Sequence, residues 1–166
     1  MKRTFDNITI GLKTFWRQYI FQSLLATVVV FGLFLVLRLE RPLITASIGA
    51  TVFIVFAMPK NVTARAKNVI GGHLIGFFVG FLLVLIPHDA FLFSIIIYSL
   101  AIGLSIFIMV ACNMEHPPAS ATALGVAMNG FSLNMAIAFF TSVALLLIVR
   151  YYFKQNLQCL VYKQPV

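Results

Sequence analysis

Six apolar segments occupy most of this 166-residue chain, and they restrict the class of fold that it can adopt. In chain order the segments are 21–37, 42–58, 69–86, 91–112, 117–130 and 133–149. Only 10% of the residues are charged, whereas a soluble domain carries roughly 25%. A helix satisfies its backbone hydrogen bonds within one segment, so we expect an all-α integral membrane protein in a lipid bilayer.

The six segments differ in length. At about 1.5 Å of rise per residue, the first, third, fourth and sixth are long enough to cross roughly 30 Å of hydrocarbon. The second is borderline, and the fifth would reach only about 21 Å. We expect the fifth segment to be tilted, sheltered by its neighbours or re-entrant.

The basic residues predict the topology. Twelve of them, against four acidic residues, give a formal charge of +8, and they lie between the apolar segments and at the termini. This scatter is typical of topology determinants and of contacts with anionic lipids, so a nucleic-acid partner is not expected. Six crossings from a cytoplasmic N-terminus place ten basic residues inside and two outside, whereas re-entrant second and fifth segments give seven against five. The positive-inside rule therefore favours six crossings of an inner (plasma) membrane, with both termini cytoplasmic.

The first twenty residues differ from the segments that follow. Apolar residues recur there every three or four positions, with Lys13 and Arg17 on the other side. This pattern predicts an interfacial amphipathic helix over residues 1–20, and a simple extension of the first span is the alternative. The transmembrane domain would then cover 21–150, and a cytoplasmic tail would cover 151–166.

Two stretches of the chain resemble each other. Glu40-Arg41-Pro42 and Glu115-His116-Pro117 share an order of acid, basic residue and proline, and small and hydroxylated residues follow each. Each stretch opens the middle segment of a three-segment half, at about 21–86 and 91–150. An odd number of spans reverses the second half, so this pattern predicts two inverted three-helix repeats with short, Pro-started helices 2 and 5. Chance similarity between helices rich in small residues is the competing explanation.

The starts of these two short helices carry the groups expected to bind a ligand. A helix N-terminus within a membrane presents free N–H groups and a positive dipole end, and both attract anions. Hydroxyl groups behind the prolines add donors, so a small oxyanion suits the arrangement. The predicted binding residues are Thr45, Ser47, Gly49, His116, Pro117, Pro118, Ser120 and Thr122.

Three more residues, Glu115, His73 and Asn68, are candidates for proton handling or gating. Ionisable groups inside a membrane are costly and usually functional. Either Glu115 or His116 would titrate as it loses water, and proton-coupled anion uptake needs such a group. For Glu115 the alternative is a helix cap or an ion pair with a basic residue of 60–67. For His73 it is a hydrogen bond to Asn68 or to a carbonyl group near the interface.

Small residues form two stripes at helical spacing. They are Gly72, Gly76 and Gly80, and Ala119, Ala123 and Ala127. For the glycine stripe, close helix packing is the expected role. The sequence contains no nucleophile elbow, metal-binding motif or phosphate-binding loop, so we expect no enzyme activity, metal or cofactor.

The His116-Pro117-Pro118 motif resembles that of the HPP family of small integral membrane proteins, which is named after it. Two further blocks, 46–51 (ASIGAT) and 67–74 (KNVIGGHL), are similar to family sequences, and the resemblance covers nearly the whole core. The family is usually described as having four spans, whereas the basic residues favour six. Plastid and cyanobacterial relatives are described as nitrite transporters, so the resemblance implies a small anion as substrate.

We therefore expect a transporter for a small inorganic anion, nitrite first, with proton coupling as an option. A homodimer would help to shield the short helices of so narrow a bundle. The alternative is a non-transporting assembly or regulatory subunit. Polar residues inside one protomer would favour the transporter, and a flat outward polar surface would favour the subunit. A titratable pair within mutual reach would raise the case for an intramembrane enzyme.

Overall fold

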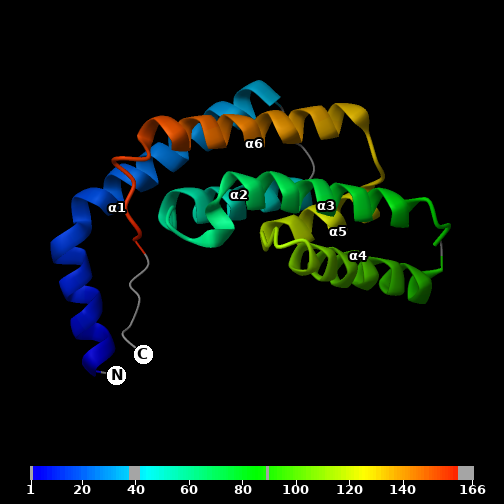
Figure 1. Ribbon diagram of the computed structural model, residues 1–166, viewed down its shortest axis with the longest axis horizontal. Coiled ribbons are helices and arrows are strands. Elements are labelled where there is room, and N and C mark those ends of the chain that lie inside the picture. Colours follow the sequence, from blue (N-terminus) through cyan, green and yellow to red (C-terminus); the bar gives the residue numbers. More distant parts are fainter. Residues whose placement is uncertain (1, 38–41, 89, 161–166) are drawn as a thin grey trace.

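The computed structural model describes residues 2–37, 42–88 and 90–160, which form helices and connecting turns with no strand (Figure 1). The helices are α1 (Lys2–Leu37), α2 (Pro42–Ala57), η1 (Val62–Ala64), α3 (Ala66–Val84), α4 (Phe91–Ala111), α5 (Pro118–Asn129) and α6 (Leu133–Phe153). Apart from η1, a single 3-10 turn, these correspond to the six expected segments. The all-α fold is confirmed.

Four of the helices are long and apolar enough to cross a membrane: α3, α4, α6 and the part of α1 from Trp16 to Leu35. The other two, α2 with 16 residues and α5 with 12, are the predicted short helices. Proline lacks an N–H and has a fixed φ, so it suits the first position of a helix, and Pro42 and Pro118 begin these two. Gly130, with φ of 79°, ends α5.

The N-terminal region does not form a separate helix. α1 runs for 36 residues without interruption, and Figure 1 shows its N-terminal part at an angle to the rest. By length and composition, Trp16–Leu35 of α1 is a candidate membrane span. An interfacial position for the preceding residues stays a prediction.

α5 lies at the centre of the bundle, where it packs against α2, α3 and α4. The glycine stripe of α3 lets α5 approach closely. A Cβ atom at Gly76 would overlap the carbonyl oxygen of Ala119, and one at Gly80 would lie 2.6 Å from the carbonyl oxygen of Ala123. The predicted role of the glycines in helix packing is therefore confirmed.

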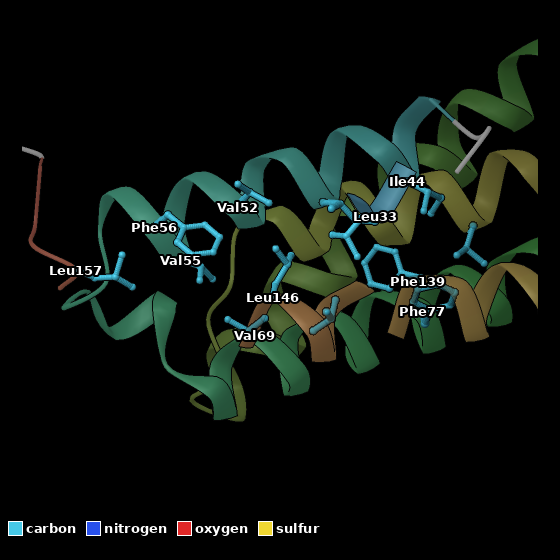
Figure 2. Close-up of a cluster of buried hydrophobic side chains, with 13 residues drawn as sticks. Leu33, Ile44, Val52, Val55, Phe56, Val69, Phe77, Phe139, Leu146 and Leu157 are labelled. Carbon is cyan, nitrogen blue, oxygen red and sulfur yellow. The ribbon is translucent and has the colours of Figure 1, made fainter. Parts of the chain in front are cut away.

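A cluster of buried apolar side chains holds α1, α2 and α6 against the other face of α3 (Figure 2). Phe56 of α2, Leu33 of α1 and Phe139 of α6 contribute to it, and the rings of Phe77 and Phe139 lie 5.0 Å apart. Removing such large side chains from water or lipid into a packed interior fixes the helix positions by close contact. The cluster leaves α4 on the opposite side of α5.

α2 and α5 run antiparallel. Near the start of α2, Ile44 packs against Gly125 in the second half of α5. One turn later, the Ser47 hydroxyl donates to the carbonyl of Pro118, at the start of α5, over 2.7 Å. The two short helices therefore enter the bundle from opposite ends, as inverted repeats require.

The repeat also predicts which residues should meet. Aligning Pro42 with Pro117 aligns Ser47 with Thr122, and the hydroxyl oxygens of these two residues lie 2.7 Å apart. Equivalent residues meet where a two-fold axis passes between the halves. The helix contacts follow the same symmetry, in which α1 corresponds to α4, α2 to α5 and α3 to α6. Each pair of helices in contact within this set has a corresponding pair that is also in contact, and the α2–α5 and α3–α6 pairs correspond to themselves. Both observations support the inverted repeat.

If all six helices cross the membrane, the α2–α3 and α4–α5 connections and the end of α6 lie on the same side. They are found at one end of the bundle, toward the left in Figure 1. Arg150 of α6 donates to the carbonyl of Pro59 over 2.8 Å, and the turn before α5 reaches η1 through His116 and Thr63. Exposed basic residues at this end are Lys60, Arg65, Lys67 and Lys154. At the other end, Phe81 of α3 contacts Phe131 of the α5–α6 turn.

Residues 154–160 of the predicted C-terminal tail fold back onto the bundle. Leu157 is buried, and the Leu160 amide donates to the Ala57 carbonyl over 2.9 Å. The buried Gln22 side chain of α1 bonds the carbonyls of Phe56 and Gln158 and accepts from the Gln158 amide over 3.1 Å. No local sequence pattern predicts these contacts, because they join residues far apart in the chain, 136 positions for Gln22 and Gln158.

Replacing Gln22 should release this segment. We expect Gln22→Ala to raise the exchange rate of the Gln158 and Leu160 amides by about tenfold or more, since losing buried hydrogen bonds costs about 1–3 kcal/mol. Hydrogen–deuterium exchange of the detergent-solubilised protein measures this. Thr27→Ala is the control, because the exposed Thr27 hydroxyl bonds only within α1, to the Ser23 carbonyl, and it should leave both rates unchanged. Equal rates in the two variants would contradict the anchoring role of Gln22.

Candidate functional site

Five polar side chains form a continuous chain of hydrogen bonds in the interior of the bundle, and all five have 0% exposure. They are Ser47 and Thr51 of α2, His73 of α3, His116 of the α4–α5 turn, and Thr122 of α5. We call this set the polar chain. Buried polar groups without hydrogen bonds would be costly, and here each has at least one partner.

Thr51 joins the two histidines. Its hydroxyl oxygen lies 3.0 Å from Nε2 of His73 and 3.1 Å from Nε2 of His116. The other ring nitrogen of His73, Nδ1, lies 3.0 Å from the Thr122 hydroxyl, which in turn contacts Ser47. The two imidazole rings meet edge to face, with 4.8 Å between their centroids.

His116 is held from the side of η1. Its Nδ1 donates to the carbonyl of Thr63 over 2.8 Å, and Asn61 caps η1 by accepting from the Thr63 amide over 3.1 Å. His116 lies in a turn outside the helices. Burial lowers its pKa from 6.5 to about 4, although the bond to Thr63 opposes this shift. His116 is therefore neutral at physiological pH.

Glu115 accepts hydrogen bonds from the side-chain amide of Asn68. The Asn68 side chain donates to the Glu115 carbonyl over 3.1 Å and to its carboxylate Oε2 over 3.4 Å. Asn68 is buried on the first turn of α3, whereas Glu115 is half-buried. The sequence did not predict a contact between these two residues, and this contact fixes the start of the motif against α3.

A cavity of about 240 Å³ adjoins the polar chain on the side of α4. Its lining residues are Ile106, Met109, Val110, Glu115, His116, Pro117 and Ser120. A water molecule takes about 30 Å³ of liquid volume, so a triatomic anion and several waters would fit. His116 belongs both to this cavity and to the polar chain, and it is the link between them.

The structure brings most of the predicted site residues together, in two groups. Ser47, His73, His116 and Thr122 belong to the polar chain, which Pro118 joins through its carbonyl. Glu115, Pro117 and Ser120 line the cavity, where the Ser120 hydroxyl donates to the Pro117 carbonyl over 2.8 Å. Thr45 is half-buried and Gly49 is exposed, and neither lines this cavity.

The N-termini of α2 and α5 do not converge on one ligand, contrary to the sequence prediction. The helices are antiparallel, and Ser47 rather than Pro42 faces the start of α5. Five residues separate Ser47 from Pro42, a rise of about 7.5 Å. The sequence predicted that the helices enter from opposite sides, but their overlap depends on packing register.

Two participants were missed by the sequence analysis. Thr51 was not selected, although it lies four residues after Ser47 and its hydroxyl oxygen is 2.9 Å from the Ser47 carbonyl. Residues four apart share one helix face, so this spacing could have identified it. Thr63 acts through its backbone carbonyl, and no side-chain pattern predicts such a role.

Comparison with known proteins agrees with these motifs. The model of the HPP transmembrane region matches residues 12–159. A transmembrane protein of Dictyostelium discoideum is 34% identical over 86 residues, which are 51% of this chain and 30% of that protein. The chain thus matches less than a third of that relative's length. No solved structure gives a significant match.

Proposed function

The chain belongs to the HPP family of transmembrane proteins, and from this premise we propose that it transports a small inorganic anion, nitrite first. The observation that carries the proposal is the position of the polar chain. It lies inside one protomer and beside a cavity, with no exposed surface of its own. A subunit that binds a partner through this motif would present it outward.

Anion binding would be linked to protonation of His116. The cavity wall is mostly apolar, and the ring nitrogens of the buried His116 are bonded to Thr51 and Thr63. A proton on His116 would therefore supply positive charge from behind this wall, without a direct contact to the anion. An anion in the cavity would raise the pKa of His116, and a protonated His116 would bind the anion more tightly, because such linkage is reciprocal. Proton-coupled transport follows from this linkage. Glu115 repels an anion while ionised and would take part when protonated.

The proposed orientation, with the basic end in the cytoplasm of an inner membrane, has a direct test. Cys112 follows α4 and Cys159 lies in the C-terminal segment, and both are exposed at this end. A membrane-impermeant maleimide should label both cysteines in inside-out vesicles and neither in right-side-out vesicles. Cys112→Ser and Cys159→Ser variants assign each signal. Labelling of the two cysteines from different sides would exclude the six-crossing topology.

Transport itself is tested in proteoliposomes. We expect nitrite uptake to follow a pH gradient and to fall at least about tenfold in His116→Ala, since catalytic proton transfer by one positioned group contributes about 10²-fold or more. His88→Ala is the matched control, because His88 lies in the α3–α4 turn at the far end of α3. Absence of flux for nitrite, nitrate, formate and chloride would reject the proposal in favour of a partner subunit.

A further inference from the structure

We propose that Thr51 is the switch of a one-proton site. Its hydroxyl holds His73 and His116 in opposite neutral tautomers, and it turns toward the Ser47 carbonyl when His116 takes up a proton. The use of this switch in transport rests on the proposed function, whereas the tautomers follow from the hydrogen bonds alone. Thr51 is a positioning residue, because it acts through the histidines.

The hydrogen bond from His116 to Thr63 determines which atom is the donor in each bond of the polar chain. A carbonyl oxygen only accepts, so Nδ1 of His116 must carry a hydrogen to bond it. A neutral imidazole has one N–H, and Nε2 of His116 is therefore an acceptor. The hydroxyl within reach of that nitrogen is Thr51, at 3.1 Å. Thr51 must donate to His116, since a buried ring nitrogen would otherwise lack a partner.

The remaining bonds follow in order. Thr51 has one hydrogen, which it gives to His116, so its oxygen accepts from Nε2–H of His73 over 3.0 Å. Neutral His73 then has a bare Nδ1, which accepts from the Thr122 hydroxyl over 3.0 Å. Ser47 can donate to Thr122 or to the Pro118 carbonyl, both at 2.7 Å. His116 is thus the Nδ1–H tautomer and His73 the Nε2–H tautomer.

The same geometry accommodates one added proton. A proton from water that binds Nε2 of His116 turns this nitrogen into a donor, and the Thr51 oxygen can accept from it. The Thr51 hydrogen then moves to the Ser47 carbonyl, 2.9 Å away. One proton and one positive charge are gained, and a single hydroxyl group rotates. No bond to Thr63 or Thr122 has to change.

A second proton is disfavoured. It would place another charge on His73, whose ring centroid is 4.8 Å from that of His116. The side chains that contact the histidine pair from α2, α5 and α6 are uncharged: Thr51, Thr122 and Phe139. Among the side chains that the structure describes, the one acid is Glu115, which is bonded to Asn68, and Arg65 and Lys67 at the start of α3 are exposed. The site therefore has capacity for one proton.

The tautomers can be observed by nitrogen-15 NMR of the full chain labelled at histidine. The protein has three histidines, so His88→Gln removes the two ring-nitrogen signals of the histidine that lies outside the site. At neutral pH we expect a protonated Nδ1 and bare Nε2 for His116, and the reverse for His73. Identical tautomers, or a charged imidazole at neutral pH, would overturn the inference.

Substitutions at Thr51 test the switch. Thr51→Val keeps the shape but removes the hydroxyl group, so it should shift the Nε2 signals of both histidines and lower proton-driven uptake by about tenfold. Thr51→Ser restores the hydroxyl and should recover both the signals and the uptake. If Thr51→Val leaves the signals unchanged, Thr51 is not the switch. Opposite tautomers without flux of any anion would reject the proposed transport but keep the histidine arrangement.

Discussion

Gly76→Ala is expected to destabilise the protein by about 3 kcal/mol. The new methyl group would overlap the backbone carbonyl oxygen of Ala119, and the next nearest atoms are the carbonyl carbon of Ala119 and the amide nitrogen of Ala123. These are backbone atoms of α5 and cannot rotate away as a side chain would. α3 and α5 would have to separate, and the contacts that hold His73 beside Thr122 would separate with them. Unfolding by SDS titration in mixed micelles, followed by circular dichroism, measures the loss.

Gly103→Ala is the matched control. Gly103 also lies within a helix, α4, but a Cβ atom there would have no atom within 4 Å. Alanine favours a helix over glycine by up to about 1 kcal/mol, so this variant should be as stable as the original protein or slightly more so. A loss in Gly103→Ala equal to that in Gly76→Ala would show that backbone propensity, and not close packing, sets the effect.

Lowering the pH from 7 to 4 should cost the folded protein roughly 3 kcal/mol through His116. Its pKa is about 4 in the folded protein against 6.5 as the ordinary value. Above pH 6.5 the residue is neutral in both states and has no effect. Between 6.5 and 4 the unfolded chain binds a proton that the folded chain does not, so stability falls with pH. Below 4 both states are protonated and this loss stops.

His116→Gln separates this effect from others. Glutamine has an amide donor for Thr63 and a carbonyl acceptor for Thr51, but it takes up no proton. The variant should therefore show a flatter pH dependence of unfolding, whatever its stability at pH 7. His88→Gln is the control and should retain the original slope. A His116→Gln slope equal to that of the unmodified protein would assign the pH dependence to other groups.

Much of the helical framework could be predicted from the sequence. Apolar runs, prolines and glycine act locally, through hydrophobic length and backbone conformation, so the positions of α2 to α6 and the shortness of α2 and α5 follow directly from the residues. The acid-basic-proline pattern also predicted antiparallel short helices.

The site was predictable only in part. His116, His73, Ser47 and Thr122 were all selected, because polar and ionisable groups are conspicuous in an apolar chain. Their arrangement was not predictable, since Ser47 and Thr122 are 75 residues apart and meet only through the register of α2 against α5.

Hydropathy and proline patterns specify an all-helical membrane protein with short, proline-started helices and a small set of polar groups in an apolar chain. Tertiary structure decided which of these groups share hydrogen bonds. It placed the Thr63 carbonyl against one histidine and the Thr51 hydroxyl between both. The physical reason is that hydrogen bonds form over about 3 Å, whereas hydropathy and proline patterns specify helices but not their mutual positions to that accuracy.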